Sequence, residues 1–178
     1  MQKRVILMVV LILLFCFSFT CQAKTYSILR YGFTFTYPDN YTQVNNPQTV
    51  FQAFNGQKDF HIIVNDKAIN QLAFMSEEDA LKKLLDKFYS DAARQIYAPI
   101  EFKIIDHSYK WTNNKEHPMT IIDYAMFLPS GENRFCVLGT VVSKGIVYSI
   151  YYLTPTFPSK EELDEAMFCL RSFYDIRR

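Results

Sequence analysis

Three histidines and a few cysteines are the residues of this chain whose chemistry most often serves catalysis or metal binding. His61 lies within an apolar run, Asp-Phe-His-Ile-Ile-Val, and His117 precedes a proline. The chain has no HExxH motif and no paired CxxC, the spacings typical of zinc sites. The segment 65–67, Asn-Asp-Lys, begins like a calcium loop but lacks the glycine and the terminal glutamate of such loops. We therefore predict no metal site and no cofactor, and interpret His61 as a hydrogen-bonded structural residue.

Nucleophilic catalysis has one candidate pair, Cys136 with His107 as its base. Cys136 lies in an apolar run, however, and apolar surroundings raise the pKa of a thiol and make it unreactive. The chain contains no GxSxG or SxxK motif and no glycine-rich phosphate loop. Asp106 and His107, close to Trp111, form its most polar and aromatic cluster, which we interpret as an exposed hairpin end. We predict that the protein is not an enzyme. The alternative is a secreted hydrolase whose site is assembled from distant residues.

The first 23 residues have the order of a secretory signal peptide. Lys3 and Arg4 precede an almost unbroken apolar run over 5–19, and small residues follow as far as Ala23. About fifteen apolar residues are fewer than the roughly 20 that a membrane-spanning helix needs. We predict cleavage after Ala23, which makes the protein periplasmic or secreted. The alternative is a lipid-anchored envelope protein in which Cys21 is acylated, although bulky residues precede this cysteine.

Cleavage leaves residues 24–178, the length of a single domain. The removed segment holds two basic residues and no acidic ones, so 17 basic and 18 acidic residues remain, a net charge of −1. A nearly neutral chain without runs of like charge lacks the electrostatic signature of a protein that binds nucleic acid or anionic membranes. We also expect no transmembrane segment in 24–178. Cys136 and Cys169 remain, and a bridge between them needs Cα atoms within about 7 Å, a condition that the sequence leaves open.

Two helices are predicted from their caps and from apolar residues at helical spacing. Ser76 is followed by acidic residues and begins a helix whose apolar spacing continues to Ile96, with Pro99 closing the segment. Ser159 and Glu162 form a better capping box and begin the second helix. The apolar stripe of this second helix consists of Leu163, Ala166, Met167 and Leu170.

The rest of the chain is predicted to form β-hairpins, with Asn55-Gly56 as the strongest turn signal. Short links favour antiparallel pairing. The last two strands are apolar on both faces, so each face needs cover, which the two helices supply. The predicted fold class is therefore α+β, an antiparallel sheet with helices packed on both faces. The predicted strands are 49–54, 58–65, 100–111, 119–128, 133–142 and 145–153.

The segment 31–41, Tyr-Gly-Phe-Thr-Phe-Thr-Tyr-Pro-Asp-Asn-Tyr, resembles the entry strand of PsbP-like domains, in which an aromatic–Gly pair opens a strand that ends at proline. The capped middle helix, the long hairpins, and a final helix that runs into Leu-Arg-Ser-Phe at 170–173 continue the resemblance. It covers most of 24–178 as an order of elements. The family includes the extrinsic photosystem subunit and exported bacterial proteins of the DcrB type. The resemblance implies an α/β/α sandwich that binds other molecules without catalysis.

Aromatic residues are abundant, with 12 Tyr and 16 Phe. Phe33 and Phe35 are expected to face the core, so the strand that carries the resemblance is interpreted as scaffold. Tyrosine is amphipathic and is favoured at interfaces. We predict Tyr41, Trp111 and Tyr151 as aromatic residues of a binding surface. The predicted function is that of an exported, non-catalytic binding or accessory protein of the cell envelope, which recognises a protein partner or a small apolar ligand.

Overall fold

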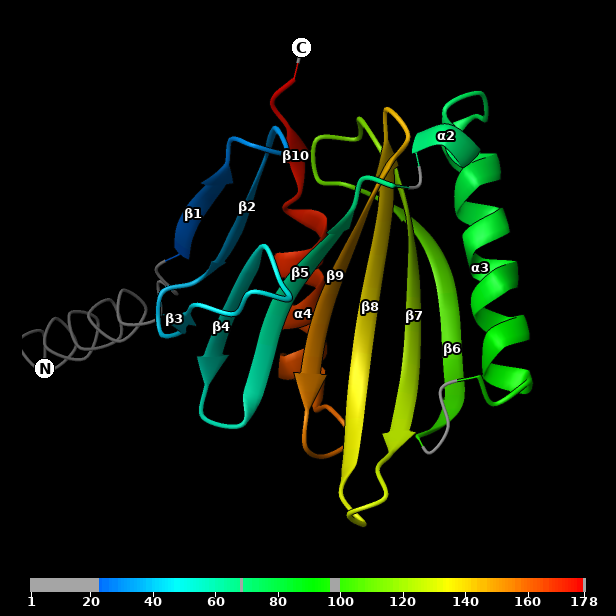
Figure 1. The fold of residues 1–178 in the computed structure, drawn as a ribbon. Coiled ribbons are helices and arrows are strands. Elements are labelled where there is room, and N and C mark those ends of the chain that lie inside the picture. The colour runs from blue at the N-terminus through cyan, green and yellow to red at the C-terminus, as the bar shows by residue number, and fades with distance from the viewer. Residues whose placement is uncertain (1–22, 68, 97–99, 178) are drawn as a thin grey trace, which may run out of the picture.

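The computed structural model describes residues 23–67, 69–96 and 100–177 of the chain. This part forms a seven-stranded and a three-stranded sheet, whose paired strands are all antiparallel, together with two long helices (Figure 1). The predicted α+β class is confirmed. Among the helices of this part, none combines the length and apolarity that a membrane crossing requires. The predicted signal peptide, apart from Ala23, and the predicted helix stop at Pro99 lie outside the described residues.

The seven-stranded sheet has the order β3-β4-β5-β9-β8-β7-β6. Three hairpins supply its six longer strands, as predicted, and the first of them turns at Gly56, whose φ of 60° a glycine adopts without strain. The predicted strand ends agree with the observed ones to within two residues. The strands are β3 (Thr42–Val44), β4 (Phe51–Asn55), β5 (Lys58–Asn65), β6 (Glu101–Trp111), β7 (Pro118–Phe127), β8 (Asn133–Ser143) and β9 (Ile146–Thr154).

A second sheet brings the two ends of the described chain together, so the prediction of a single sheet was wrong. It consists of β1 (Ala23–Ile28), β2 (Phe33–Pro38) and β10 (Tyr174–Asp175), with β2 in the middle. β10 has only two residues, which is too short to show the alternation of apolar and polar residues that indicates a strand. Its pairing with β2 depends on tertiary packing.

The helices are α3 (Glu77–Ala93) and α4 (Lys160–Arg171), with a short α2 (Ile69–Leu72) before α3. The capping box of α4 is complete, as predicted, and the Ser76 hydroxyl caps α3. α3 ends before the predicted Ile96, because Gln95 adopts a left-handed φ of 53°. The Ile96 amide donates to the Asp91 carbonyl and the Gln95 amide to the Ala92 carbonyl, the two bonds of a Schellman motif.

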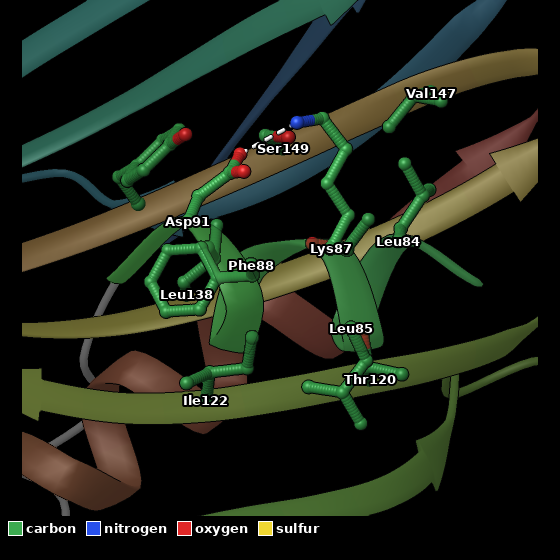
Figure 2. Close-up of a pocket in the computed structure, with 12 residues that line it drawn as sticks. Leu84, Leu85, Lys87, Phe88, Asp91, Thr120, Ile122, Leu138, Val147 and Ser149 are labelled. Carbon is green, nitrogen blue, oxygen red and sulfur yellow. Dashed lines mark hydrogen bonds and ion pairs between the residues drawn. The ribbon is translucent and has the colours of Figure 1, made fainter. Parts of the chain in front are cut away.

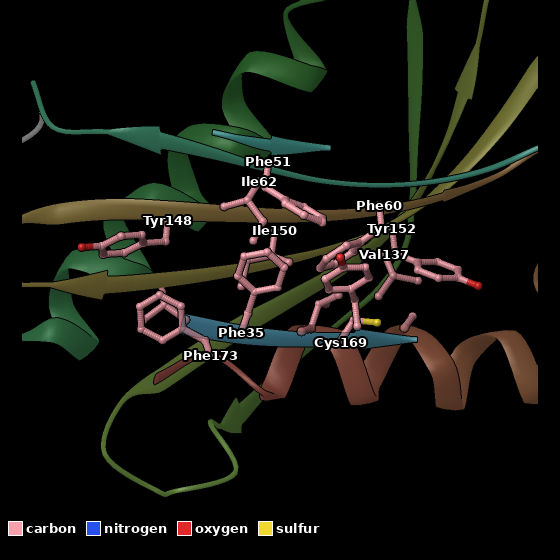
Figure 3. Packing of buried hydrophobic residues seen from close by; sticks show 14 of the residues in the cluster. Phe35, Phe51, Phe60, Ile62, Val137, Tyr148, Ile150, Tyr152, Cys169 and Phe173 are labelled. Carbon is pink, nitrogen blue, oxygen red and sulfur yellow. The ribbon is translucent and has the colours of Figure 1, made fainter. Parts of the chain in front are cut away.

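The largest core lies between one face of the seven-stranded sheet and the layer formed by β2 and α4 (Figure 3). Phe33 and Phe35 are fully buried in it, which confirms that the 31–41 segment is scaffold. Phe35 meets Phe51 edge-on at a centroid distance of 4.7 Å, and Phe33 stacks on Phe173 at 5.3 Å. Such pairs add stability beyond their buried area. The abundant aromatic residues are thus used largely for packing.

The side chains of β8 alternate between two cores, as expected for a strand. Val137 and Val141 belong to the core that contains α4, whereas Cys136 and Leu138 pack with Leu85 of α3. Gly139 lets α4 approach β8 closely, since a Cβ at this position would lie 2.9 Å from the Leu170 side chain. We call the side of the sheet that carries Cys136 and Leu138 the α3 face.

Candidate functional site

A groove of about 190 Å³ lies between α3 and the α3 face of the sheet (Figure 2). We call it the α3 groove. Its lining combines apolar side chains with a smaller number of polar ones. The apolar residues are Leu84, Leu85, Phe88, Ile122, Leu138, Val147 and Tyr151, and the polar ones are Lys87, Asp91, Thr120, Thr140 and Ser149.

The local structure explains why these side chains converge. Leu84, Phe88 and Asp91 are spaced at i, i+4 and i+7, so they project from one side of α3. On the sheet, alternate residues of a strand share a face, which brings Val147, Ser149 and Tyr151 of β9 alongside Leu138 of β8. The groove therefore follows from helical spacing on one wall and strand alternation on the other.

The charged groups at the groove neutralise each other. The Lys87 ammonium lies 2.6 Å from an Asp91 carboxylate oxygen, one helical turn away. Figure 2 shows this pair beside Ser149 of β9. Because the pair carries no net charge, the rim gives little electrostatic attraction to either an anion or a cation. The contact that the groove offers is mainly apolar.

A hydrogen-bonded polar cluster extends from the groove across β5 and β4 on the α3 face. The His61 ring stacks on Tyr151 with a centroid distance of 4.7 Å, and its Nδ1 lies 3.2 Å from a carboxylate oxygen of Asp59. The Gln52 amide donates to both Asp59 oxygens, at 3.0 and 3.1 Å. The prediction that His61 is a hydrogen-bonded structural residue is confirmed.

The three predicted surface aromatics lie in different environments. Tyr151 is half-buried and lines the α3 groove. Trp111 is 47% exposed and, together with Tyr109, lines a separate depression of about 380 Å³ against the first turns of α3. The structure therefore does not bring Trp111 and Tyr151 into one site. The roles of these two residues in binding stay predictions.

The prediction that Tyr41 belongs to a binding surface is wrong, because its side chain is only 3% exposed. Its hydroxyl donates a hydrogen bond of 2.6 Å to Glu165 of α4. Burial, followed by this hydrogen bond, raises the pKa of Tyr41 well above its usual range. Tyr41 therefore contributes to the core, and its position in a loop after β2 gave no sign of the Glu165 acceptor.

The other two histidines each bind one residue of α3. His107 Nδ1 lies 2.9 Å from the Tyr89 hydroxyl, and His117 Nδ1 lies 3.0 Å from a Glu77 carboxylate oxygen. The hydrogen bond to Glu77 raises the pKa of His117. Both contacts attach α3 to the sheet. Over 23–67, 69–96 and 100–177, no three His, Cys, Asp or Glu side chains are grouped so that they could hold a metal ion.

No bond joins Cys136 to Cys169, so the disulfide that the sequence left open is not formed. Cys136 lies in the core under α3, while Cys169 lies in the core between α4 and the other face of the sheet. Burial raises the pKa of Cys136 to about 12. The prediction that this thiol is unreactive therefore agrees with its surroundings.

We expect both thiols of the chain that begins at Lys24 to react with Ellman's reagent in denaturant without a reducing agent. In the native protein the same reaction should be slow, because both side chains are at most 2% exposed. Thiol counting in the two conditions measures this. A denatured chain with no reactive thiol would contradict the structure and establish the bridge.

No protein-family model matches the chain, and no curated protein matches it. Solved structures share its fold. Cyanobacterial PsbP (CyanoP) from Synechocystis sp. PCC 6803 aligns with a TM-score of 0.55 and 14% identity, over 89% of this chain and 95% of that one. A Bacteroides thetaiotaomicron VPI-5482 protein aligns with a TM-score of 0.52 and 15% identity, over 85% and 48%. A mutant of protein Mog1 gives 0.50 and 10%, over 87% and 96%. The chain thus has an α+β fold similar to that of cyanobacterial PsbP.

Proposed function

We propose that the protein is an exported, non-catalytic binding protein of the cell envelope, with the α/β/α sandwich of PsbP-like domains, and that the α3 groove receives an apolar side chain of a protein partner. Three observations support the proposal. The first 23 residues have the order of a signal peptide. α3 and α4 pack against alternate side chains of β8. The fold is similar to that of cyanobacterial PsbP (CyanoP).

The observation that carries the proposal is the size and lining of the groove. Pockets for drug-sized ligands span roughly 300–1,000 Å³, whereas an apolar cavity of about 150 Å³ is enough for benzene. A volume of about 190 Å³ therefore suits one apolar or aromatic side chain better than a whole small-molecule ligand. For the α3 groove, a protein partner is therefore favoured over a small apolar ligand.

Two further apolar residues are exposed on the same face of the sheet as the groove. Phe54 of β4 and Ile63 of β5 lie on the α3 face and are 36% and 37% exposed. Protein interfaces typically place a buried anchor in a pocket and surround it with weaker contacts that exclude water. The groove with Tyr151 serves as the pocket, and Phe54 and Ile63 belong to the surrounding contacts.

A hydrolase has less support at this site. Enzyme pockets bring polar groups of shifted pKa together. Among the residues that the structure describes, the most strongly raised pKa values belong to Cys136, Tyr41 and Tyr152, and burial in the core is the main cause of each. These groups contribute to packing and lie outside the groove lining.

We expect Ser149→Trp to abolish partner binding, because the indole would fill the groove from its rim. The measurement is co-purification of the tagged protein from the native envelope at low and high salt, with partners identified by mass spectrometry. The partner should persist at high salt, since burial of apolar surface does not weaken with ionic strength. A photoreactive benzoylphenylalanine in place of Phe88 should crosslink to the same partner.

Ser149→Ala is the matched control, because it keeps the groove open, and it should recover the partner as wild type does. Thermal unfolding of both variants shows whether the fold is intact. If Ser149→Trp retains the partner at wild-type levels, or if the partner leaves all variants as salt rises, the groove is not the binding site.

A further inference from the structure

β6 forms one edge of the seven-stranded sheet, and within 23–67, 69–96 and 100–177 its only paired neighbour is β7. It is eleven residues long, and eight of these residues are exposed. An edge strand presents backbone N–H and C=O groups on its outer side, which can pair with another strand. Natural proteins usually keep such edges short or covered. Figure 1 shows β6 at the end of the sheet opposite β3.

A β-bulge at Ile105 changes the face to which the side chains of β6 point. Ile104 pairs with Tyr124, and His107 pairs with Ile122, and both partners lie on the α3 face. Before the bulge, the even-numbered residues therefore lie on the α3 face, and after it the odd-numbered ones do. In an antiparallel pair of two β6 strands, residues that lie opposite each other must point to the same face of the sheet. For residues on different sides of the bulge, this requires an even-numbered residue of one copy to lie opposite an odd-numbered residue of the other.

We propose that β6 pairs with β6 of a second copy of this chain, antiparallel and about a two-fold axis, so that the two seven-stranded sheets form one continuous sheet. In the register centred between Ile105 and Asp106, Glu101 lies opposite Lys110 of the second copy, and each contact occurs twice. On the α3 face, Phe102 lies opposite Tyr109 of the second copy.

Charge complementarity and the length of the overlap together select this register. Opposite charges directly across a strand pair stabilise it, and like charges destabilise it. A shift of two residues in one direction places Lys103 opposite Lys110 of the second copy. The same shift in the other direction sets Lys103 opposite Asp106, but it moves the last three residues of β6 beyond the start of the partner strand and pairs only 101–108. The register centred between Ile105 and Asp106 avoids the lysine pair, keeps Lys110 opposite Glu101 and aligns ten of the eleven residues of β6, 101–110.

Most residues of β6 are left exposed by the rest of the described chain. α3 packs mainly on β7 and β8 and contacts β6 less. The exposed apolar side chains of β6 are Ile105, Tyr109 and Trp111, each 45–53% exposed. Aromatic and branched side chains on a long edge strand are unusual unless a partner covers them. Pairing with a second copy covers Ile105 at the centre of the interface and Tyr109 on each side of it.

The test is sedimentation analysis of the purified chain and of two charge-reversal variants over a concentration series. Wild type should form a dimer. Glu101→Lys and Lys110→Glu should each raise the dissociation constant roughly tenfold to a hundredfold, because two pairs of like charges replace two pairs of opposite charges. An equimolar mixture of the two variants should restore dimers, since both contacts of the heterodimer are then of opposite charge.

Lys103→Glu is the matched control, because it makes the same change of charge on the same face of β6 opposite the uncharged Ser108 of the second copy. Its dissociation constant should stay within a few-fold of wild type. The proposal is overturned if wild type is monomeric at a few hundred micromolar, if Lys103→Glu has the same effect as Lys110→Glu, or if the mixed variants fail to associate. A failure here leaves the α3 groove untouched, since none of these residues lines it.

Discussion

Replacing Glu165 with alanine should lower the free energy of unfolding by about 3 kcal/mol, because two buried tyrosines lose the carboxylate that accepts their hydrogen bonds. The hydroxyls of Tyr41 and Tyr152 both donate to the same oxygen of Glu165, at 2.6 and 2.7 Å. These residues come from the loop after β2, from β9 and from α4, so one carboxylate joins three elements. Urea unfolding followed by far-UV circular dichroism measures the loss.

Two further variants separate the hydrogen bonds from the charge. Glu165→Gln keeps an acceptor oxygen but removes the ion pair with Lys58, whose ammonium lies 3.7 Å away, so it should cost clearly less than alanine. In the Glu165→Ala background, changing Tyr41 and Tyr152 to Phe should regain part of the loss, because no hydroxyl is then left unsatisfied. If the glutamine and alanine variants lose equal stability, the ion pair, and not the shared acceptor, accounts for the effect.

Asp175→Asn should destabilise the protein at neutral pH by about 2 kcal/mol, and the effect should disappear in acid. Burial alone would raise the pKa of Asp175, but hydrogen bonds from Arg177 and Ser143 outweigh it and lower the pKa to about 2. The Arg177 guanidinium lies 2.8 Å from one carboxylate oxygen, and the Ser143 hydroxyl donates to it at 2.5 Å. A carboxylate with a depressed pKa adds stability above its unfolded pKa, near 3.8, and this stability is lost as the pH falls through about 2.

The measurement for Asp175 is the difference in unfolding free energy between wild type and variant from pH 7 down to pH 2. We expect a constant difference above about pH 4 that shrinks below it. Asp164→Asn serves as the control, because this aspartate is exposed on α4 and its removal should change stability by no more than a few tenths of a kcal/mol at any pH. A difference that persists unchanged at pH 2 would mean that the amide perturbs packing and that the charge is not responsible.

The hairpins and helix starts could be predicted because their signals are local. Asn55-Gly56 specifies a turn, and Ser159 with Glu162 specifies a helix start, whatever the rest of the chain does. β10 could not be predicted, because two residues carry no periodic pattern and their pairing depends on β2. The same holds for Tyr41, whose burial depends on Glu165, far away in the sequence. Local chemistry therefore predicted the elements, and only packing decided which surfaces they bury.

The candidate site was predictable only in part for the same reason. Tyr151 stood out by its residue type, and it does line the α3 groove. Its neighbours Leu84 and Phe88 showed in the sequence only as the apolar stripe of a helix, with no sign that part of the stripe stays accessible. Cys136 and Cys169 are not bonded, because they lie in cores on opposite faces of the seven-stranded sheet. Composition and spacing do not reveal to which core each cysteine belongs.

The central position of β2 between β1 and β10 has a consequence for the order in which the chain folds. The Thr36 amide donates to the Ser172 hydroxyl, 136 residues away, and Phe33 stacks on Phe173. Contacts of such long sequence separation close late and slow folding. During synthesis from the N-terminus, β2 can pair with β1 early, but it lacks β10 until residues 174 and 175 have been made. The aromatic side chains of β2 therefore lack part of their packing partners until residues 172–175 have been made.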